Sequence, residues 1–275
     1  MKSWPDRVPP WRLWMVPAGI VLGLVLGTLV TILIEFVGHF GGSSLSHPSA
    51  VTSVAGDIGF EAAFVAAAIM MASVAAVRPH AADFGFRRIT WRSGIAAGLT
   101  AMAGYYLVTA IYAEVFSLRG KDKLPSELIA HHSTPALVVA TVYVCAVAPM
   151  AEETFFRGFV FGGLRRLHAE LFGVQLGPWI AALVTALLFG LAHTGSASPQ
   201  YLVPLGILGF VLCLVRWKTD SLYPGMAMHS ANNALALGVN QLHWSGGEVL
   251  GLMILSWAVI AAVVGPLAAR TPRPA

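Results

Sequence analysis

Long apolar segments constrain the fold of this chain more than any other feature of its sequence. A helix needs about 20 apolar residues to cross the hydrocarbon core of a bilayer. Because every backbone polar group must be paired inside lipid, such segments are expected to be helical. The sequence therefore predicts an all-α, polytopic membrane protein, with about eight transmembrane helices in a bundle. The candidates lie near residues 14–37, 57–77, 93–117, 136–164, 179–195, 200–215, 222–242 and 248–268.

The composition agrees with lipid as the solvent of this chain. Of its 275 residues, 57% are hydrophobic and 11% are charged, whereas a soluble domain carries about 25% charged residues. So few charges cannot cover a water-exposed surface, and the apolar segments leave almost no residues for a soluble domain. We therefore expect one integral membrane domain over residues 1–275. The formal charge of +4 fits the flanks of membrane helices, and no nucleic-acid partner is expected.

The distribution of basic residues predicts how the protein is oriented in the membrane. Cytoplasmic loops are enriched in Lys and Arg. With eight helices and the N-terminus inside, three of the 17 Lys and Arg residues lie in outside loops, and Arg157 lies within a helix. The other thirteen lie in inside segments. We therefore expect both termini to be cytoplasmic and the loop 43–53 to be extracytoplasmic.

Charged side chains within the fourth apolar segment indicate a functional site, because ionisable groups inside a membrane are costly and usually functional. Glu153 and Arg157 are four residues apart, so they share a helix face and can form an ion pair. That pair could be purely structural. Glu152 is rotated by about 100° from Glu153, so it is left free for chemistry. Pro149 in the preceding turn is expected to kink the helix.

Two later segments carry histidines within or at the edge of an apolar run. Phe189 and His193 are four residues apart in the fifth segment, as are His229 and Asn233 in the seventh. A carboxylate and a histidine can hold and deprotonate a water molecule. A second histidine with an amide can donate hydrogen bonds to a developing oxyanion.

These three motifs, in this order, resemble those of the CAAX protease and bacteriocin-processing family, also called the ABI family. Its eukaryotic members include the type II CAAX prenyl endopeptidase. The family pattern is Glu-Glu-x-x-x-Arg, then Phe-x-x-x-His, then His-x-x-x-Asn or Asp. Here it reads Glu152 to Arg157, Phe189 to His193, and His229 to Asn233. The resemblance covers about residues 135–242.

The resemblance implies an α-helical intramembrane endopeptidase that acts on a prenylated-type or other membrane-associated peptide or membrane-protein substrate. By this resemblance, Glu152 would activate the hydrolytic water with His193 as its partner. His229 and Asn233 would stabilise the oxyanion. Glu153, Arg157 and Phe189 would support these groups.

A zinc ion is the alternative to a metal-free glutamate mechanism. Glu152, His193 and His229 are a plausible ligand set, since catalytic zinc sites use three protein ligands and a water. The sequence has no His-Glu-x-x-His helix, and the three side chains come from separate helices. We expect the metal-free mechanism and no obligatory cofactor.

Two other functions compete with proteolysis. A non-enzymatic bacteriocin-immunity or scaffold protein could keep the same fold. A proton-coupled carrier could use Glu35, Glu61 and Glu114, although the sequence shows no internal repeat. Proteolysis also requires convergence in depth. Counting about 1.5 Å per residue from the inner helix ends puts Glu152 and His193 about 20 Å deep and His229 about 10 Å deep.

Overall fold

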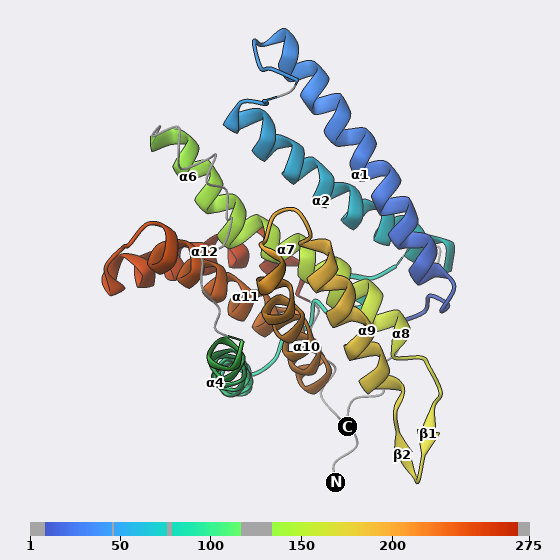
Figure 1. The fold of residues 1–275 in the computed structure, drawn as a ribbon. Coiled ribbons are helices and arrows are strands. Elements are labelled where there is room, and N and C mark those ends of the chain that lie inside the picture. Colours follow the sequence, from blue (N-terminus) through green and yellow to red (C-terminus); the bar gives the residue numbers. More distant parts are fainter. Residues whose placement is uncertain (1–8, 46, 76–78, 117–133, 269–275) are drawn as a thin grey trace.

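The computed structural model of the chain describes residues 9–45, 47–75, 79–116 and 134–268. Each of the eight apolar segments coincides with a helix or a continuous run of helices (Figure 1). Six single helices are α1 Met15–Phe40, α2 Ala50–Ala75, α4 Trp91–Val115, α9 Gly177–Ala192, α10 Leu202–Thr219 and α12 Gly246–Val264. The fourth segment is the run α6 Thr134–Val142, η1 Tyr143–Val147, α7 Ala148–Glu152, η2 Glu153–Val160 and α8 Phe161–Leu164. The seventh is α11 Tyr223–Leu235 followed by η4 Ala236–Gln241.

Short elements connect these helices. They are α3 Ala81–Phe84, strands β1 Glu170–Leu171 and β2 Val174–Gln175, and the single 3₁₀ turns η3 Pro199–Tyr201 and η5 Gly265–Leu267. The two strands form an antiparallel hairpin between α8 and α9. Its tip residue Phe172 has a positive φ of 49°, and Gly173 follows with a φ of 76°, which closes the tight turn.

Six of the helices within the described residues are long and apolar enough to cross a membrane. Helix α9 is apolar but has only 16 residues. The run of α11 and η4 is not among the six, and it carries the polar side chains of His229, Asn232 and Asn233. The predicted all-α, polytopic membrane fold is confirmed. Two of the eight expected segments, α9 and the run of α11 and η4, are helical but do not meet the criteria of length and apolar character for crossing a membrane.

Polar caps explain where two of the helices begin. Helix α2 starts at Ala50, seven residues earlier than expected, because the Ser49 hydroxyl accepts a hydrogen bond from the Thr52 backbone N–H at 3.3 Å. Helix α12 starts after Ser245, whose hydroxyl accepts from the Glu248 backbone N–H, while the Glu248 carboxylate accepts from the Ser245 backbone N–H. This reciprocal pair is a capping box.

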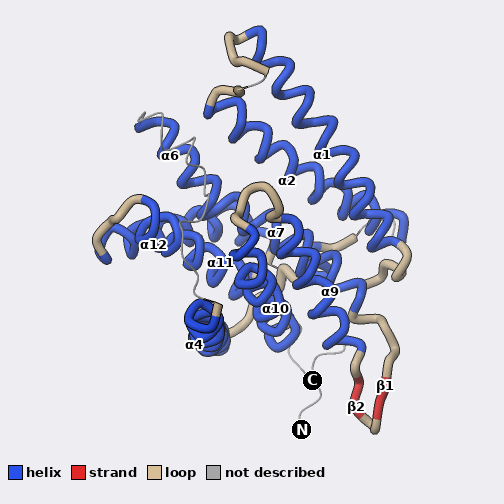
Figure 2. The backbone as a smooth tube through the Cα atoms, viewed as in Figure 1, coloured by secondary structure: helices blue, strands red, loops and turns tan. Residues whose placement is uncertain are grey.

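The run from α6 to α8 lies at the centre of the bundle (Figures 1 and 2). It contacts α2, α9, α11 and α12, which surround it. Helices α1 and α2 pack together along their length on one side, and α9 packs with α10 on another. Helix α4 lies against α10 and α11. Any side chain on the central run therefore reaches neighbours from several parts of the sequence.

Large apolar side chains cover much of the outer surface of the bundle. On α1 alone, Leu29, Leu33, Phe36 and Phe40 are 53–77% exposed. A water-soluble protein rarely exposes so contiguous an apolar surface. These helices therefore present to lipid the faces that they do not use for packing.

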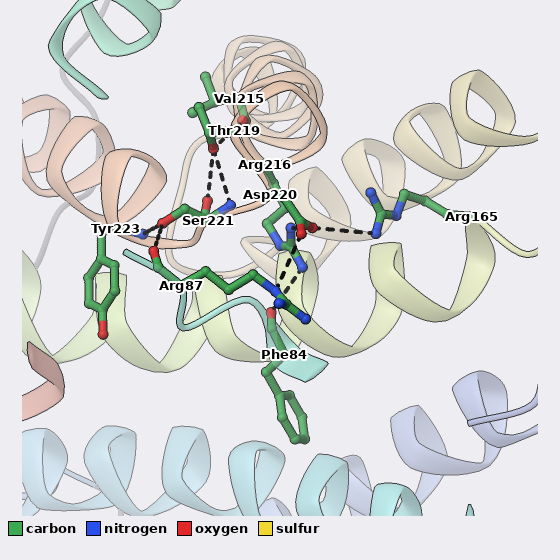
Figure 3. A network of polar contacts seen from close by, with 9 residues as sticks. All are labelled: Phe84, Arg87, Arg165, Val215, Arg216, Thr219, Asp220, Ser221 and Tyr223. Atoms are coloured by element: carbon green, nitrogen blue, oxygen red, sulfur yellow. Dashed lines mark hydrogen bonds and ion pairs between the residues drawn. The ribbon is translucent and has the colours of Figure 1, made fainter. Parts of the chain in front are cut away.

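A polar network joins the turn between α10 and α11 to the segment after α3 (Figure 3). Asp220 has a positive φ of 51° at the end of α10. Its carboxylate accepts a hydrogen bond from Arg216 Nη1 at 2.7 Å and lies 3.3 Å from Arg87 Nε. Arg165 Nη2 lies 4.0 Å from the same carboxylate. Because the Ser221 hydroxyl also donates to the Arg87 carbonyl at 2.8 Å, the network fixes the point where α11 begins.

Candidate active site

Two widened helical turns flank the pair of glutamates in the central run. The run is π-helical over η1, Tyr143–Val147, and again over η2, which begins at Glu153. Pro149 has no backbone N–H to donate to residue 145, so the helix cannot keep its regular bonding there and widens instead of breaking. Single π-helical turns are frequent at functional sites. Glu152 thus ends a short α-helical stretch, while Glu153 opens the second widened turn.

Glu153 is the centre of a buried charged cluster. Its Oε1 accepts a hydrogen bond from Arg157 Nη1 at 2.8 Å, so the predicted ion pair forms. The same oxygen lies 3.2 Å from His229 Nδ1. A carboxylate can only accept hydrogen bonds, so Nδ1 carries the proton and donates it. All three side chains are at most 2% exposed, and the positive charge of Arg157 offsets the cost of burying the carboxylate.

Phe189 packs against this cluster and orders it. The guanidinium of Arg157 lies over its ring, 4.2 Å from the centroid, which is a cation–π contact. Phe189 also meets the rings of His193 and His229, with centroid distances of 4.8 Å and 5.6 Å. Arg157 Nη2 donates further to the carbonyl of Gly209 on α10 at 3.2 Å. Arg157 and Phe189 thus hold both histidine rings in place.

Glu152 lies on the other side of His229. Its Oε2 is 3.7 Å from His229 Nε2, which is too long for a direct hydrogen bond and suits two groups that contact one water molecule. This oxygen has no hydrogen-bond partner among the described residues. Because Nδ1–H of His229 is donated to Glu153, the lone pair of a neutral His229 is on Nε2 and faces Glu152.

The difference in depth between His229 and Glu152 expected from sequence is absent. Helix α11 begins among the buried residues Leu222, Pro224 and Met226, so its first turn already lies within the protein. The Tyr223 hydroxyl donates to the Val264 carbonyl at 2.8 Å and anchors this start against α12. His229 therefore reaches the level of the glutamates.

His193 and Asn233 are positioned by bonds to the backbone. His193 directly follows α9, and its Nδ1 donates to the carbonyl of Phe189 at 2.8 Å. The Asn233 amide donates one hydrogen to the carbonyl of Val144 at 2.8 Å. Its Oδ1 accepts from Asn232 Nδ2 at 3.4 Å, and Asn232 Oδ1 accepts in turn from Tyr106 on α4 at 3.2 Å. One N–H of Asn233 remains for a ligand.

All four predicted catalytic side chains line a single cavity of about 710 Å³. Glu152, His193, His229 and Asn233 come from the central run, the end of α9 and α11. The supporting residues Glu153, Arg157 and Phe189 lie behind this lining and are almost fully buried. The structure therefore brings together the full set of residues that the three motifs predicted.

The cavity also has polar residues that sequence reasoning did not assign to the site. Asp57 and Glu61 of α2 and Tyr143 of the central run line it, and Tyr143 donates to Glu61 Oε1 at 2.9 Å. The available signal was Glu61, an acid near the outer end of the second apolar segment, and it was assigned to the carrier hypothesis. Glu35 and Glu114, grouped with it in the carrier hypothesis, do not line the cavity.

The donor set does not fit a three-ligand zinc site. No three His, Cys, Asp or Glu side chains gather closely enough to hold a metal ion in the part of the chain that the structure describes. Among the three expected ligands, only Glu152 and His229 come within ion-pair distance of each other. We therefore derive no step through a metal.

Comparison with known proteins finds two bacterial relatives that match about half of this chain. A 24.3 kDa protein of Escherichia coli, described as uncharacterized, is 27% identical over 135 residues, which cover 47% of this chain and 59% of that protein. UPF0177 protein YxdF of Lactococcus lactis is 26% identical over 154 residues, which cover 55% of this chain and 76% of that protein. This chain thus spans less than two thirds of the Escherichia coli protein. No solved structure matches it.

Residues 134–235 match a known protein family, described as type II CAAX prenyl endopeptidase, Rce1-like. This stretch is close to the predicted core of 135–242, and it holds all three motifs. The family and the six apolar helices together make this an integral, multi-pass membrane protein. Over residues 134–235 the chain is thus similar to the Rce1-like family of type II CAAX prenyl endopeptidases.

Proposed function

We propose that this protein is an intramembrane endopeptidase that hydrolyses a peptide bond with a water molecule activated by Glu152. The observation that carries this proposal is the placement of Glu152 Oε2 and His229 Nε2 3.7 Å apart in the wall of one cavity. A water bound to both would donate one hydrogen to each. The family of residues 134–235 supports a CAAX-type protease activity for the fold.

The first step is attack by this water on the carbonyl carbon of the scissile bond. Glu152 accepts the proton as the oxygen–carbon bond forms, and His229 Nε2 keeps the water oriented through its second hydrogen. Glu153 fixes the tautomer of His229 by accepting from its Nδ1, and Arg157 holds the charge on Glu153. The two glutamates therefore have separate roles, one as base and one as support.

The second step is collapse of the tetrahedral intermediate. Its oxyanion accepts a hydrogen bond from the remaining N–H of Asn233. His193 donates a further bond when it is an imidazolium, because its Nδ1 proton is already given to the Phe189 carbonyl. Glu152 then returns its proton to the leaving nitrogen as the carbon–nitrogen bond breaks. The products are a carboxylic acid and an amine. Relative to the roles implied by resemblance, this proposal exchanges the roles of the two histidines.

Replacing Glu152 tests the proposal directly. Glu152→Gln keeps the shape of the side chain and removes the base, so peptide fragments that depend on this protein should disappear from the membrane proteome. The matched control is Glu170→Gln, which makes the same change in the exposed β1–β2 hairpin. Proteolysis retained in Glu152→Gln would end the mechanism. A cellular phenotype that survives this change would favour the immunity or scaffold function instead.

A further inference from the structure

The basic residues and the catalytic cavity lie toward opposite ends of the bundle. Eight described basic residues lie before α1, between α3 and the start of α4, just after α8, and in the last turn of α10: Arg12, Arg87, Arg88, Arg92, Arg165, Arg166, Arg216 and Lys218. The described connections at the other end, residues 41–45, 47–49, 193–198 and 242–245, contain no Lys or Arg, while residues 117–133, with Arg119, Lys121 and Lys123, lie outside the described residues. Figure 1 shows the β1–β2 hairpin at the first end and the connection between α1 and α2 at the other.

The cavity reaches the molecular surface at the end poor in basic residues. Its lining includes the connection Thr194–Ala197 between α9 and η3, of which residues 194–196 are exposed. It also includes Asp57, about two turns from the start of α2, and Ala236, which follows α11. None of the lining residues belongs to the connections at the basic end.

The lining carries three carboxyl groups and no Lys or Arg beside them. Asp57, Glu61 and Glu152 contribute carboxylates, and the lining contains no Lys or Arg. Glu61 Oε2 is buried and has no hydrogen-bond partner among the described residues, although Tyr143 donates to its Oε1. A buried carboxylate oxygen without a partner is a site for a donor supplied by a ligand. The lining offers no Lys or Arg to pair with the carboxylate at the C-terminus of a peptide.

We propose that the substrate enters from the extracytoplasmic side and carries Lys or Arg beside the bond that is cut. The positive-inside rule assigns the basic end of the bundle to the cytoplasm, so the cavity opens on the opposite side. This inference rests on the proposed protease function. The inference favours, as the substrate, an outward-facing segment of a membrane or exported peptide. It disfavours the C-terminal peptide of a cytoplasmic protein, which ends in a carboxylate.

Cysteine labelling in intact cells shows on which side of the membrane the cavity opens, and it needs no knowledge of the substrate. Ser196→Cys places a thiol at the rim of the cavity, and Phe172→Cys places one at the tip of the hairpin, which is 95% exposed. The native cysteines, Cys145 and Cys213, are buried, so the unmodified chain is the blank. A membrane-impermeant maleimide should label Ser196→Cys in intact cells and Phe172→Cys only after permeabilisation. The reverse pattern would overturn the proposal, whether or not the protein is a protease.

The fragments that depend on Glu152 test the class of substrate. Their cleavage sites should lie in outward-facing segments with Lys or Arg within a few residues. Asp57→Asn combined with Glu61→Gln should slow their formation by about tenfold, since a charge-assisted bond to the substrate is lost. Cleavage sites at cytoplasmic C-termini would overturn the inference and leave the proposed function standing. If no fragment depends on Glu152, the proposed function itself fails, while the labelling still reports the side.

Discussion

His229 lies between two glutamates whose neighbours differ, and the difference determines what each carboxylate can do. Glu153 is bonded to Arg157, so its charge is balanced inside the protein. Glu152 has no arginine beside it and lines the cavity, where it can exchange a proton. The spacing of four residues predicted the ion pair. The contact between His229 and Glu153 joins segments 76 residues apart, and no local rule could predict it.

Arg157 should matter more for stability than for chemistry. Arg157→Met leaves the Glu153 carboxylate buried without a balancing charge, which should lower the free energy of unfolding by about 3–5 kcal/mol. Thermal unfolding of the purified protein in detergent measures this. Arg157→Met combined with Glu153→Gln removes both charges and should recover most of the loss. A double variant as unstable as the single one would show that the ion pair is not the cause.

Asn233 should contribute to the chemical step. Asn233→Ala removes the proposed oxyanion donor, and loss of one such donor typically lowers kcat by about 10²–10³. The measurement is kcat with a peptide identified from the Glu152-dependent fragments. Asn232→Ala, which removes one of the two bonds that orient Asn233 and leaves the bond to the Val144 carbonyl, should have a smaller effect. If the two variants lost the same activity, Asn233 would be acting as a structural residue.

At the scale of elements, the turn between α10 and α11 connects a remote polar network to the site. Asp220→Ala removes the carboxylate that Arg87 and Arg216 share and leaves two nearby guanidiniums without their common anion. We expect a loss of about 3–5 kcal/mol in the free energy of unfolding. Activity should also fall, because the start of α11 positions His229. Thermal unfolding and kcat together test this, with Asp220→Asn as the milder variant. Full activity in Asp220→Ala would show that the polar network does not position His229.

The eight helices could be predicted from sequence because apolar length is a local property. Their widened turns could not, because a proline such as Pro149 predicts the loss of a regular helical bond and a kink, but not that the helix widens there instead. The β1–β2 hairpin was also missed. Its strands have two residues each, too few to show an alternating pattern. The signal that remained in the sequence was Gly173, because glycine favours a turn whose φ angles are positive, as those of Phe172 and Gly173 are.

At the scale of the whole molecule, the site is an outcome of tertiary packing. The motifs predicted which side chains take part, but helix depth measured along the sequence placed His229 too far from Glu152. Depth counted residue by residue assumes that every helix begins at the membrane surface, whereas α11 begins inside the protein. The acids on α2 were missed for a related reason, because only the folded bundle brings them to the cavity.

Removal of metal ions should leave activity unchanged. The proposed mechanism uses Glu152, His193, His229 and Asn233 alone, and the described residues provide no three-ligand cluster. The test is elemental analysis of the purified protein together with an activity assay after treatment with a strong chelator. Activity that is lost on chelation and restored by zinc would contradict the mechanism.

The cavity wall supplied by α2 has a consequence for how this protein and its relatives can diverge. Asp57 and Glu61 lie outside residues 134–235, the part of the chain that carries the family motifs. Under the proposed function, the residues for hydrolysis and the acids that select the substrate therefore lie in separate stretches of the polypeptide. Exchanging α2 between two such proteins is then expected to change which substrates are cut more than it changes the hydrolytic step.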